Sequence, residues 1–469
     1  MSLKRSRHFT PQRLAVWGDL KKRVESRSAA VAIGGGREFA SMSSDSPALA
    51  PPLSRVRTRQ AFLFGGLLLT LMNFASPAGG MIDIPVTFFL KNRMHLNANE
   101  LAVFKLWIGV PLILGFVFGF IRDRWSPFGS GDRAHLLLFG VTTALIYGSM
   151  SLINPTYSLF LLGLFVATMA FRMVSSAAYG ITNTIAQKHA VSGQMSSVIS
   201  IGSAVPDLIS FIGGGMLSQT LEGESAAAAA RILFFCAAGL MLAIAVMGLL
   251  GPNWVFKEAR REVSKVNILE DLKRIVGHWP IYPAMLIQLL WQFSPSTGTV
   301  LQYHIVDHLH ATDSQWGLWQ GIFFGSFIPV YTAYGFLSRR FALRLLLWFG
   351  FTLAISQMCP LLLVDNARGA IIAAAPMGLL GALAQASLID LVIRSAPPGS
   401  QGTVMMMFYA LYYFSVRFGD LFGTWIYDKH GGFIPTVVIT VIVYALILPV
   451  ILLVPKRLTA TKDGEAIVI

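Results

Sequence analysis

Three ionised side chains lie inside apolar runs that are long enough to cross a bilayer. Asp207 lies near the middle of one run, and Arg417 and Asp420 lie deep in another. An unpaired charge in the hydrocarbon region costs several kcal/mol, so membrane proteins keep such residues mainly along water-filled pathways. These positions predict a transporter whose chemistry is the binding of protons and anions.

Proton coupling requires a carboxylate that can gain and lose a proton inside the membrane. Asp207 lies about twelve residues into its run, or about 18 Å along a helix that rises about 1.5 Å per residue. A carboxylate balanced between burial and a nearby cation can load and release a proton. We predict Asp207 as the leading proton-coupling residue and Asp420 as the second. The alternative for Asp207 is a static ion pair, for instance with Arg172.

Two arginines deep in apolar runs are candidate contacts for an anionic substrate. Arg172 and Arg417 each lie far from the ends of their runs. A guanidinium is always charged and binds a carboxylate through two parallel hydrogen bonds. We therefore predict both as substrate-binding residues. The alternative for Arg417 is a pair with Asp420, three residues further along the same helical face.

The first and seventh apolar runs carry polar residues close to prolines. Proline leaves backbone carbonyls that polar neighbours or water must satisfy, so such stretches suit the lining of a cavity. Aromatic side chains there can stack on a planar ligand, or they can simply pack. The remaining predicted substrate-binding residues are Asn73, Asp83, Trp291, Gln292, Ser294, Ser296 and Tyr413.

The composition is that of a polytopic membrane protein. The chain has 469 residues, of which 54% are hydrophobic and 13% charged, whereas soluble domains carry about 25% charged residues. Most of the net charge of +14 lies in loops and tails, where basic residues fix orientation and contact anionic lipid. We predict a monomer that binds a small-molecule substrate and the lipid bilayer, and no nucleic acid.

The hydropathy pattern repeats from residue 60 onward. A bilayer core needs about 20 apolar residues per helix, and the pattern predicts twelve spans. We divide the chain into a disordered or targeting tail (1–58), a six-helix bundle (59–251), a linker with an amphipathic helix (252–280), a second six-helix bundle (281–455) and a C-terminal tail (456–469). The spans lie near 61–84, 99–121, 135–153, 157–180, 195–217, 231–251, 281–304, 315–337, 344–364, 370–393, 402–426 and 434–454.

The basic residues of the short loops predict the orientation. One side collects Arg122, Arg124, Arg133, the basic cluster in 257–274 and the basic residues of 339–344 and 456–462. Such loops remain in the cytoplasm. We therefore predict an integral, multi-pass protein with both termini cytoplasmic.

The two bundles also resemble each other. The second span ends in Gly-Phe-Ile-Arg-Asp-Arg at 119–124, and the eighth ends in Gly-Phe-Leu-Ser-Arg-Arg at 335–340. Two six-helix repeats joined by a cytoplasmic linker indicate the major facilitator fold, an all-α membrane protein of two pseudo-symmetric bundles with its site between them at the midplane.

Five stretches resemble the folate–biopterin transporter family of the major facilitator superfamily. They are Ile-Pro-Val-Thr-Phe-Phe-Leu-Lys at 84–91, His-Leu-Asn-Ala-Asn-Glu-Leu-Ala at 95–102, the loop at 119–129 ending in Pro-Phe-Gly, Ser-Pro-Ser at 294–296 and Ala-Pro-Pro-Gly at 396–399. The loop at 129–133 departs from the family by one missing basic position. The resemblance implies proton-coupled uptake of folate or pterin-like compounds by alternating access.

The family pattern also predicts a gate. Gly119, Asp123 and Arg124 lie at the cytoplasmic end of the second span, where Asp123 can pair with a basic residue or with the N-terminus of another gating helix in one conformation. The alternative is a solvated loop charge. Asp390 and Arg394, one helical turn apart, are predicted to form a local ion pair.

Other chemistries find little support in the sequence. His304 and His308 have metal-ligand spacing, but they lie at the outer end of a span, where an interfacial cap is the better interpretation. No glycine-rich phosphate loop leads into a helix. We predict no metal, no cofactor and no enzyme activity. Two alternatives stay open: a major facilitator carrier for a glycoside or another organic acid, and a non-transporting assembly factor on the same fold.

Overall fold

The structure is a computed structural model, and every described residue lies in the unit formed by residues 50–468. It describes residues 53–465, with gaps at 78, 80, 84–85, 87–89, 91–93, 97, 153–155, 223–225, 261–267 and 430. The predicted tail lies outside the described residues up to position 52. Within the described part the chain forms helices and no strands.

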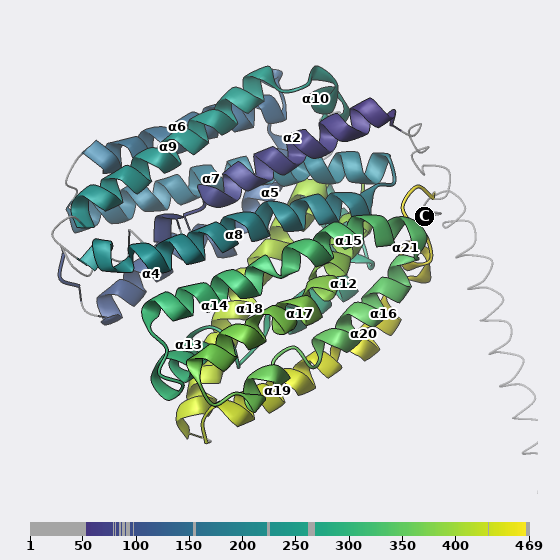
Figure 1. Cartoon of the computed structure of the whole chain (residues 1–469). Helices are drawn as coiled ribbons and strands as arrows, with labels where there is room; N and C mark the ends of the chain where they lie inside the picture. The colour runs from purple at the N-terminus through teal and green to yellow at the C-terminus, as the bar shows by residue number, and fades with distance from the viewer. Residues whose placement is uncertain are drawn as a thin grey trace, which may run out of the picture. The chain divides into compact units, whose positions relative to one another are not determined.

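Two sets of helices follow one another along the chain (Figure 1). The N-terminal half comprises α2 (Arg55–Phe74), α4 (Ala98–Ile113), α5 (Gly115–Arg124), α6 (Asp132–Leu152), α7 (Tyr157–Lys188), α8 (Ser192–Glu222) and α9 (Ala226–Leu250). The C-terminal half comprises α12 (Ile281–Gln292), α13 (Thr299–Tyr303), α14 (Asp313–Gly325), α15 (Phe327–Arg340), α16 (Leu343–Ala354), α17 (Ala367–Ser395), α18 (Gln401–Lys429), α19 (Phe433–Ala445) and α20 (Ile447–Leu453).

The protein is an integral, multi-pass membrane protein. Among the described residues, nine helices are long and apolar enough to cross a bilayer. The spans predicted near 61–84, 281–304 and 402–426 are not among these nine. The count of twelve therefore stays a prediction.

Two predicted spans are broken rather than continuous. Helix α2 begins after Ser54, whose side chain accepts a hydrogen bond from the Arg57 amide, and it ends at Phe74, shortly before Pro77. Helix α12 ends at Gln292, and α13 begins only at Thr299. The segment between them contains Ser-Pro-Ser at 294–296, and proline cannot donate the helical hydrogen bond.

The linker and the C-terminal segment carry short helices. The linker contains α10 (Asn253–Ala259) and α11 (Ile268–Gly277), in which Ile275 is buried while Leu272 and Val276 are exposed. Helix α21 (Lys456–Thr459) follows the last long helix and contacts α16 and α17. We call the end of the helices that carries Arg122, Arg124, Arg339 and Arg340 the basic end.

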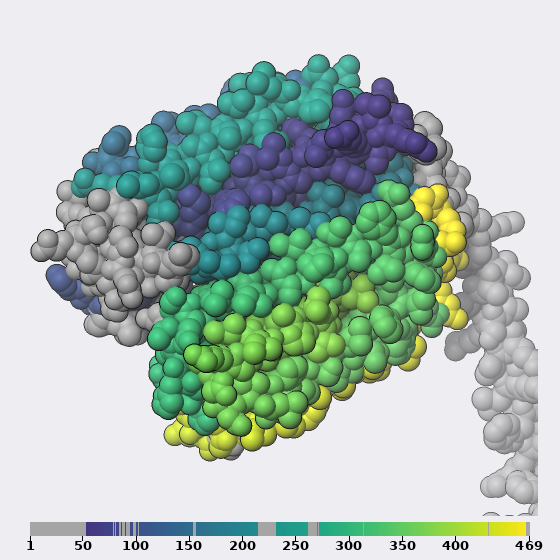
Figure 2. Space-filling view, viewed as in Figure 1, coloured from purple at the N-terminus to yellow at the C-terminus, as the bar shows by residue number. Residues whose placement is uncertain are grey.

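The two halves meet along a continuous interface, which we call the seam. Helix α8 of the N-terminal half packs against α14, α15 and α17, and α18 of the C-terminal half packs against α4, α5 and α7 (Figure 1). One apolar cluster draws buried residues from both halves. In the space-filling view the purple-to-teal and green surfaces meet along this line (Figure 2).

Candidate functional site

Arg172 lies at the centre of the seam. It is the sixteenth residue of the 32-residue helix α7 and is 3% exposed. Its Nη2 donates to the Leu112 carbonyl at 3.1 Å, and its guanidinium carbon lies 5.0 Å from the ring centroid of Tyr413 on α18. Its buried Nε has no hydrogen-bond partner. Among the described residues no carboxylate forms an ion pair with Arg172, and its electrostatic partners are tyrosines.

A stacked tyrosine pair crosses the seam next to Arg172. Tyr179 of α7 and Tyr409 of α18 have ring centroids 4.6 Å apart and an interplanar angle of 29°. Tyr179 is seven residues beyond Arg172, and Tyr409 is four residues before Tyr413, so each pair lies on one helical face. Sequence reasoning did not assign Tyr179, although its spacing from Arg172 is a signal that could have found it.

Asp207 faces the opposite half of the molecule. It follows Pro206 in α8 and lies about 22 Å from the start of that helix at about 1.5 Å per residue. Its carboxylate lies within electrostatic range of Tyr331 on α15 and Tyr412 on α18, both in the C-terminal half. No described residue donates a hydrogen bond to Asp207 or pairs with it. The alternative of a static pair with Arg172 is therefore not formed.

Arg417 and Asp420 do not pair with each other. The Asp420 carboxylate accepts hydrogen bonds from the amide and hydroxyl of Thr299, at 2.7 and 3.0 Å, and so caps the start of α13. Arg417 is exposed and has no ion-pair partner among the residues that the structure describes. Asp420 thus has a structural partner that the sequence did not reveal, which argues against its use as a proton site.

The polar stretch of the seventh predicted span is packed mainly inside the C-terminal half. Trp291 packs edge-on against Phe351 and tilted against Tyr444, with centroids 5.5 and 4.7 Å away. Its Nε1 donates to Gln385, which also accepts from Gln292. These partners lie in helices of the same half, which argues against direct substrate contact by Trp291.

The serines of this stretch are also enclosed. Ser296 is fully buried and bonds to Thr440 of α19 through its amide and its hydroxyl, at 3.2 and 2.9 Å. Ser294 is 5% exposed, and an added Cβ on Gly419 would approach its amide to 3.0 Å. Both serines are packed within the C-terminal half, and the Thr440 hydroxyl accepts from the Ser296 amide in the broken part of the span. This position argues against the predicted substrate contact.

Asn73 and Asp83 each have partners within the N-terminal half, and Asn73 is also a hydrogen-bond partner of Tyr179 next to Arg172. The Asn73 side chain donates to the carbonyls of Leu69 and Gly202, which ties α2 to α8 within the N-terminal half. Asp83 pairs with Lys105 at 3.0 Å, and both side chains are partly exposed. The predicted substrate-binding set therefore separates into three groups. Arg172 and Tyr413 lie in the seam with Asn73 next to them. Arg417 is exposed, and the others have local structural partners.

The basic end of the seam is closed by contacts between α5 and α18. Asp123 accepts hydrogen bonds from the Thr403 amide at 3.0 Å and from its hydroxyl at 2.7 Å. The Asp123 carboxylate thus lies at the N-terminus of α18, where the helix dipole favours negative charge. An added Cβ on Gly119 would lie 2.7 Å from the Thr403 Cα, so this close approach requires glycine.

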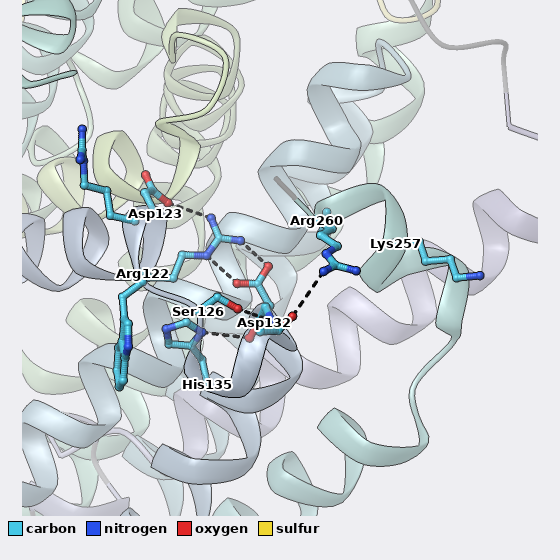
Figure 3. Close-up of a pocket in the computed structure, with 12 residues that line it drawn as sticks. Arg122, Asp123, Ser126, Asp132, His135, Lys257 and Arg260 are labelled. Carbon is cyan, nitrogen blue, oxygen red and sulfur yellow. Dashed lines mark hydrogen bonds and ion pairs between the residues drawn. The ribbon is translucent and has the colours of Figure 1, made fainter. Parts of the chain in front are cut away.

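Arg122 holds two carboxylates beside this crossing. It donates to Asp123 at 2.9 Å and from Nε to Asp132 at 2.7 Å, with a further bond to the other Asp132 oxygen (Figure 3). The sequence places Arg122 next to Asp123 in the predicted gate, but it did not indicate the bonds to Asp132. Arg124 lies with its guanidinium carbon 5.5 Å from the centroid of the Phe120 ring.

A pocket of about 480 Å³ opens next to these residues. Charged groups of several elements line it, and Arg260 reaches toward the Gly129 carbonyl from the linker (Figure 3). The charged and polar residues that line it include Arg122, Asp123, Arg124, Ser126, Asp132, His135, Lys257 and Arg260.

A second group of charges closes the basic end between the α7–α8 turn and α17. The predicted pair forms, with Arg394 Nε 2.8 Å from Asp390 Oδ1. Gln187 of α7 donates to the carbonyls of Ile393 and Ala396, at 2.5 and 2.8 Å. The predicted ion pair between Asp390 and Arg394 is therefore confirmed. It also belongs to a network that joins the two halves, and the i, i+4 spacing of the two residues did not indicate that network.

Comparisons with known proteins support the transporter interpretation. No family model matches the chain. A stretch of 139 residues, 28% of this chain and 30% of the relative, is 24% identical to folate transporter 2 of Plasmodium falciparum (isolate 3D7). The matched stretch thus spans less than a third of the length of that relative.

Solved structures of major facilitator superfamily transporters resemble the whole fold. The transporter FucP in its outward conformation aligns with a TM-score of 0.63 at 16% identity, covering 84% of this chain and 98% of that one. The proton:xylose symporter XylE gives 0.64 at 13%, covering 87% and 98%. The human organic anion transporter MFSD10 gives 0.54 at 16%, covering 86% and 100%.

The fold prediction is confirmed, because these matches show the major facilitator fold. The folate transporter match supports the resemblance to the folate–biopterin transporters within that superfamily. All of these relatives are described as transporters.

Proposed function

We propose that this chain, with its major facilitator fold, is a secondary active transporter of a small organic anion, with folates and pterins as the leading candidates. The observation that carries the proposal is Arg172, a buried guanidinium in the seam with no acidic partner among the described residues. Burial without a counter-ion is costly, and an incoming carboxylate would offset that cost. Tyr413 and the Tyr179–Tyr409 pair place aromatic rings next to this guanidinium, and we propose that a planar heterocycle stacks against them when the seam opens.

Proton symport by alternating access is the proposed mechanism. Asp207 faces the C-terminal half across the seam and has no hydrogen-bond partner among the described residues, so its charge state depends on whether water reaches it. Protonation would accompany substrate binding, and deprotonation would follow when the seam opens on the other side. The basic end is the cytoplasmic end in this proposal. The bonds from Asp123 to the start of α18 then close the cytoplasmic side while the substrate site is open to the outside.

Uptake into proteoliposomes tests the cargo and the role of Arg172. Purified protein is reconstituted with an inward proton gradient and offered radiolabelled folate, a pterin, another organic acid and a neutral hexose. We expect uptake of an anion. Arg172→Ala should reduce the uptake by about tenfold or more, because a hydrogen bond to a charged group contributes about 1.5–3 kcal/mol.

Arg344 provides the matched control, since it is exposed on α16 outside the seam. Arg344→Ala should transport as the parent does. The anion proposal is wrong if the parent takes up only the hexose, and the role of Arg172 is wrong if both alanine variants transport equally.

A further inference from the structure

We propose that the segment 460–465 is a latch in which Asp463 completes the closure of the basic end. Asp463 acts at the start of α8 as Asp123 acts at the start of α18. The inference deepens the proposed function and rests on its alternating-access cycle.

Asp463 binds the N-terminus of a helix in the opposite half. Its two carboxylate oxygens accept from the amides of Gly193 at 3.0 Å and Gln194 at 2.9 Å, at the start of α8. The Asp463 side chain is 1% exposed. This is the same arrangement that Asp123 makes with the Thr403 amide, and the helix dipole favours the anion in both places.

The second half lacks a carboxylate of its own at this place. When Gly335 is aligned with Gly119, the position of Asp123 is occupied by Arg339. The neighbouring Ser338 donates from its hydroxyl to Asp463 at 3.2 Å, and the Asp463 amide donates back to the Ser338 carbonyl at 3.0 Å. The C-terminal segment thus delivers the acid that the end of α15 does not carry.

The helix crossing at the latch is as close as the crossing at the gate. An added Cβ on Gly193 would lie 2.3 Å from the Ser338 Cβ and 2.9 Å from an Asp390 carboxylate oxygen. Gly119 shows the same closeness to Thr403 at the α5–α18 crossing. Both crossings therefore combine a glycine, a helix start and a buried aspartate.

Arg394 bridges two carboxylates, as Arg122 does on the other side. It binds Asp390 at 2.8 Å and Asp463 at 3.2 Å, and it also donates to the Ser192 hydroxyl and the Thr461 carbonyl, at 2.9 and 2.8 Å. The Gly464 amide donates to the Ala190 carbonyl in the N-terminal half at 2.8 Å. The segment therefore spans both halves, and opening the basic end must break its bonds on one side.

The ionisation of the Asp463 carboxylate depends on the groups that surround it in the latch. Burial raises the pKa of Asp463 and the charge of Asp390 raises it further, while Arg394 and the amides of Gly193 and Gln194 act in the opposite direction. When α8 moves away, the carboxylate loses the two amides and must be solvated instead. The latch thus holds while the basic end is closed and releases when it opens.

Spin-label distances across the basic end test the latch without any substrate. Labels are attached to cysteines at the exposed positions Ser130 and Arg344, one in each half, after replacement of Cys236 and Cys359. We expect one short distance for the parent. Asp463→Ala should add a longer distance and raise the ratio of open to closed molecules by about tenfold, the effect of losing charge-assisted hydrogen bonds.

Glu465→Gln is the matched control, because Glu465 lies two residues further on in a half-exposed pair with Lys462. It should leave the distances unchanged, and Asp463→Asn, which preserves the side-chain shape, should open the basic end if the alanine variant does not fold. Distances for the Asp463 variants equal to those of the parent, or an equal opening by Glu465→Gln, overturn the latch. This readout is independent of cargo: a distance change without anion uptake contradicts only the proposed function, and uptake without a distance change contradicts only the latch.

Discussion

At the scale of single residues, hydrogen-bond and ion-pair partners distinguish the charged side chains that can act in transport from those that stabilise the fold. Asp420 is held by two donors from Thr299, and Asp83 by Lys105. Asp207 has no such donor in the described part of the chain. A carboxylate with fixed donors resists protonation, whereas one without them responds to the water that reaches it.

This difference predicts distinct effects of removing the two charges. Asp207→Asn cannot take up a proton, so we expect loss of accumulation driven by a proton gradient while exchange of substrate across the membrane continues. Measurements of gradient-driven uptake and of counterflow in the same proteoliposomes check this. If Asp207→Asn still accumulates substrate, Asp207 does not couple transport to protons.

Asp420→Asn should instead act on stability. The asparagine keeps only one good acceptor at the start of α13, and loss of a helix cap costs about 1 kcal/mol. We expect a lower thermal unfolding temperature in detergent with proton coupling preserved. Uncoupled transport at an unchanged unfolding temperature would reverse the assignment of the two acids.

The residue scale also shows what the sequence could predict. Arg172 and Tyr413 were both predicted as substrate contacts, and the structure brings them together across the seam. Trp291 and Ser296 were predicted by the same reasoning, but they face partners within their own half. Hydropathy identifies a polar or aromatic residue in a span, but it does not say which face of the helix meets the seam.

At the scale of helices, the close crossing of α5 and α18 predicts a strong effect of a single methyl group. An added Cβ on Gly119 would lie 2.7 Å from the Thr403 Cα, and overpacking of this kind costs about 1–3 kcal/mol. Gly119→Ala should therefore disfavour the closed basic end and slow uptake. The spin-label distances and the initial rate of uptake measure this.

Gly109 offers the control in the same predicted span, since an added Cβ there meets nothing within 4 Å. Gly109→Ala should close and transport as the parent does. Equal behaviour of the two alanine variants would mean that the crossing tolerates the methyl group and that Gly119 is not part of the gate.

The helices also show which features hydropathy does not predict, namely the exact ends and breaks of the spans. The predicted spans locate the long helices well, but α7 continues to Lys188 and α12 stops at Gln292. Apolar residues flank the break at 293–298 on both sides, so a hydropathy average over a whole span predicts one continuous helix. The break depends on bonds such as those of Ser296 with Thr440, which join positions far apart in the sequence.

At the scale of the whole molecule, the basic end is closed twice. Asp123 joins α5 to α18, and Asp463 joins the C-terminal segment to α8. The resemblance to the transporter family predicted a gate at the first closure. The sequence could not predict the second, because Asp463 lies beyond the last apolar run and its partners are some 270 residues earlier.

Both closures oppose the same opening motion, so we expect their contributions to the free energy of the closed state to be additive. The bonds described above for Asp123 and Asp463 share no residue, and they connect different helix pairs, so their contributions to the closed state should add within about 0.3–0.5 kcal/mol. The ratio of open to closed molecules in the double variant Asp123→Asn/Asp463→Asn should therefore equal the product of the two single effects. Spin-label distances on the three variants and the parent measure these ratios. A double variant no more open than either single one would mean that the two aspartates act on one shared contact, and that the closures do not act independently.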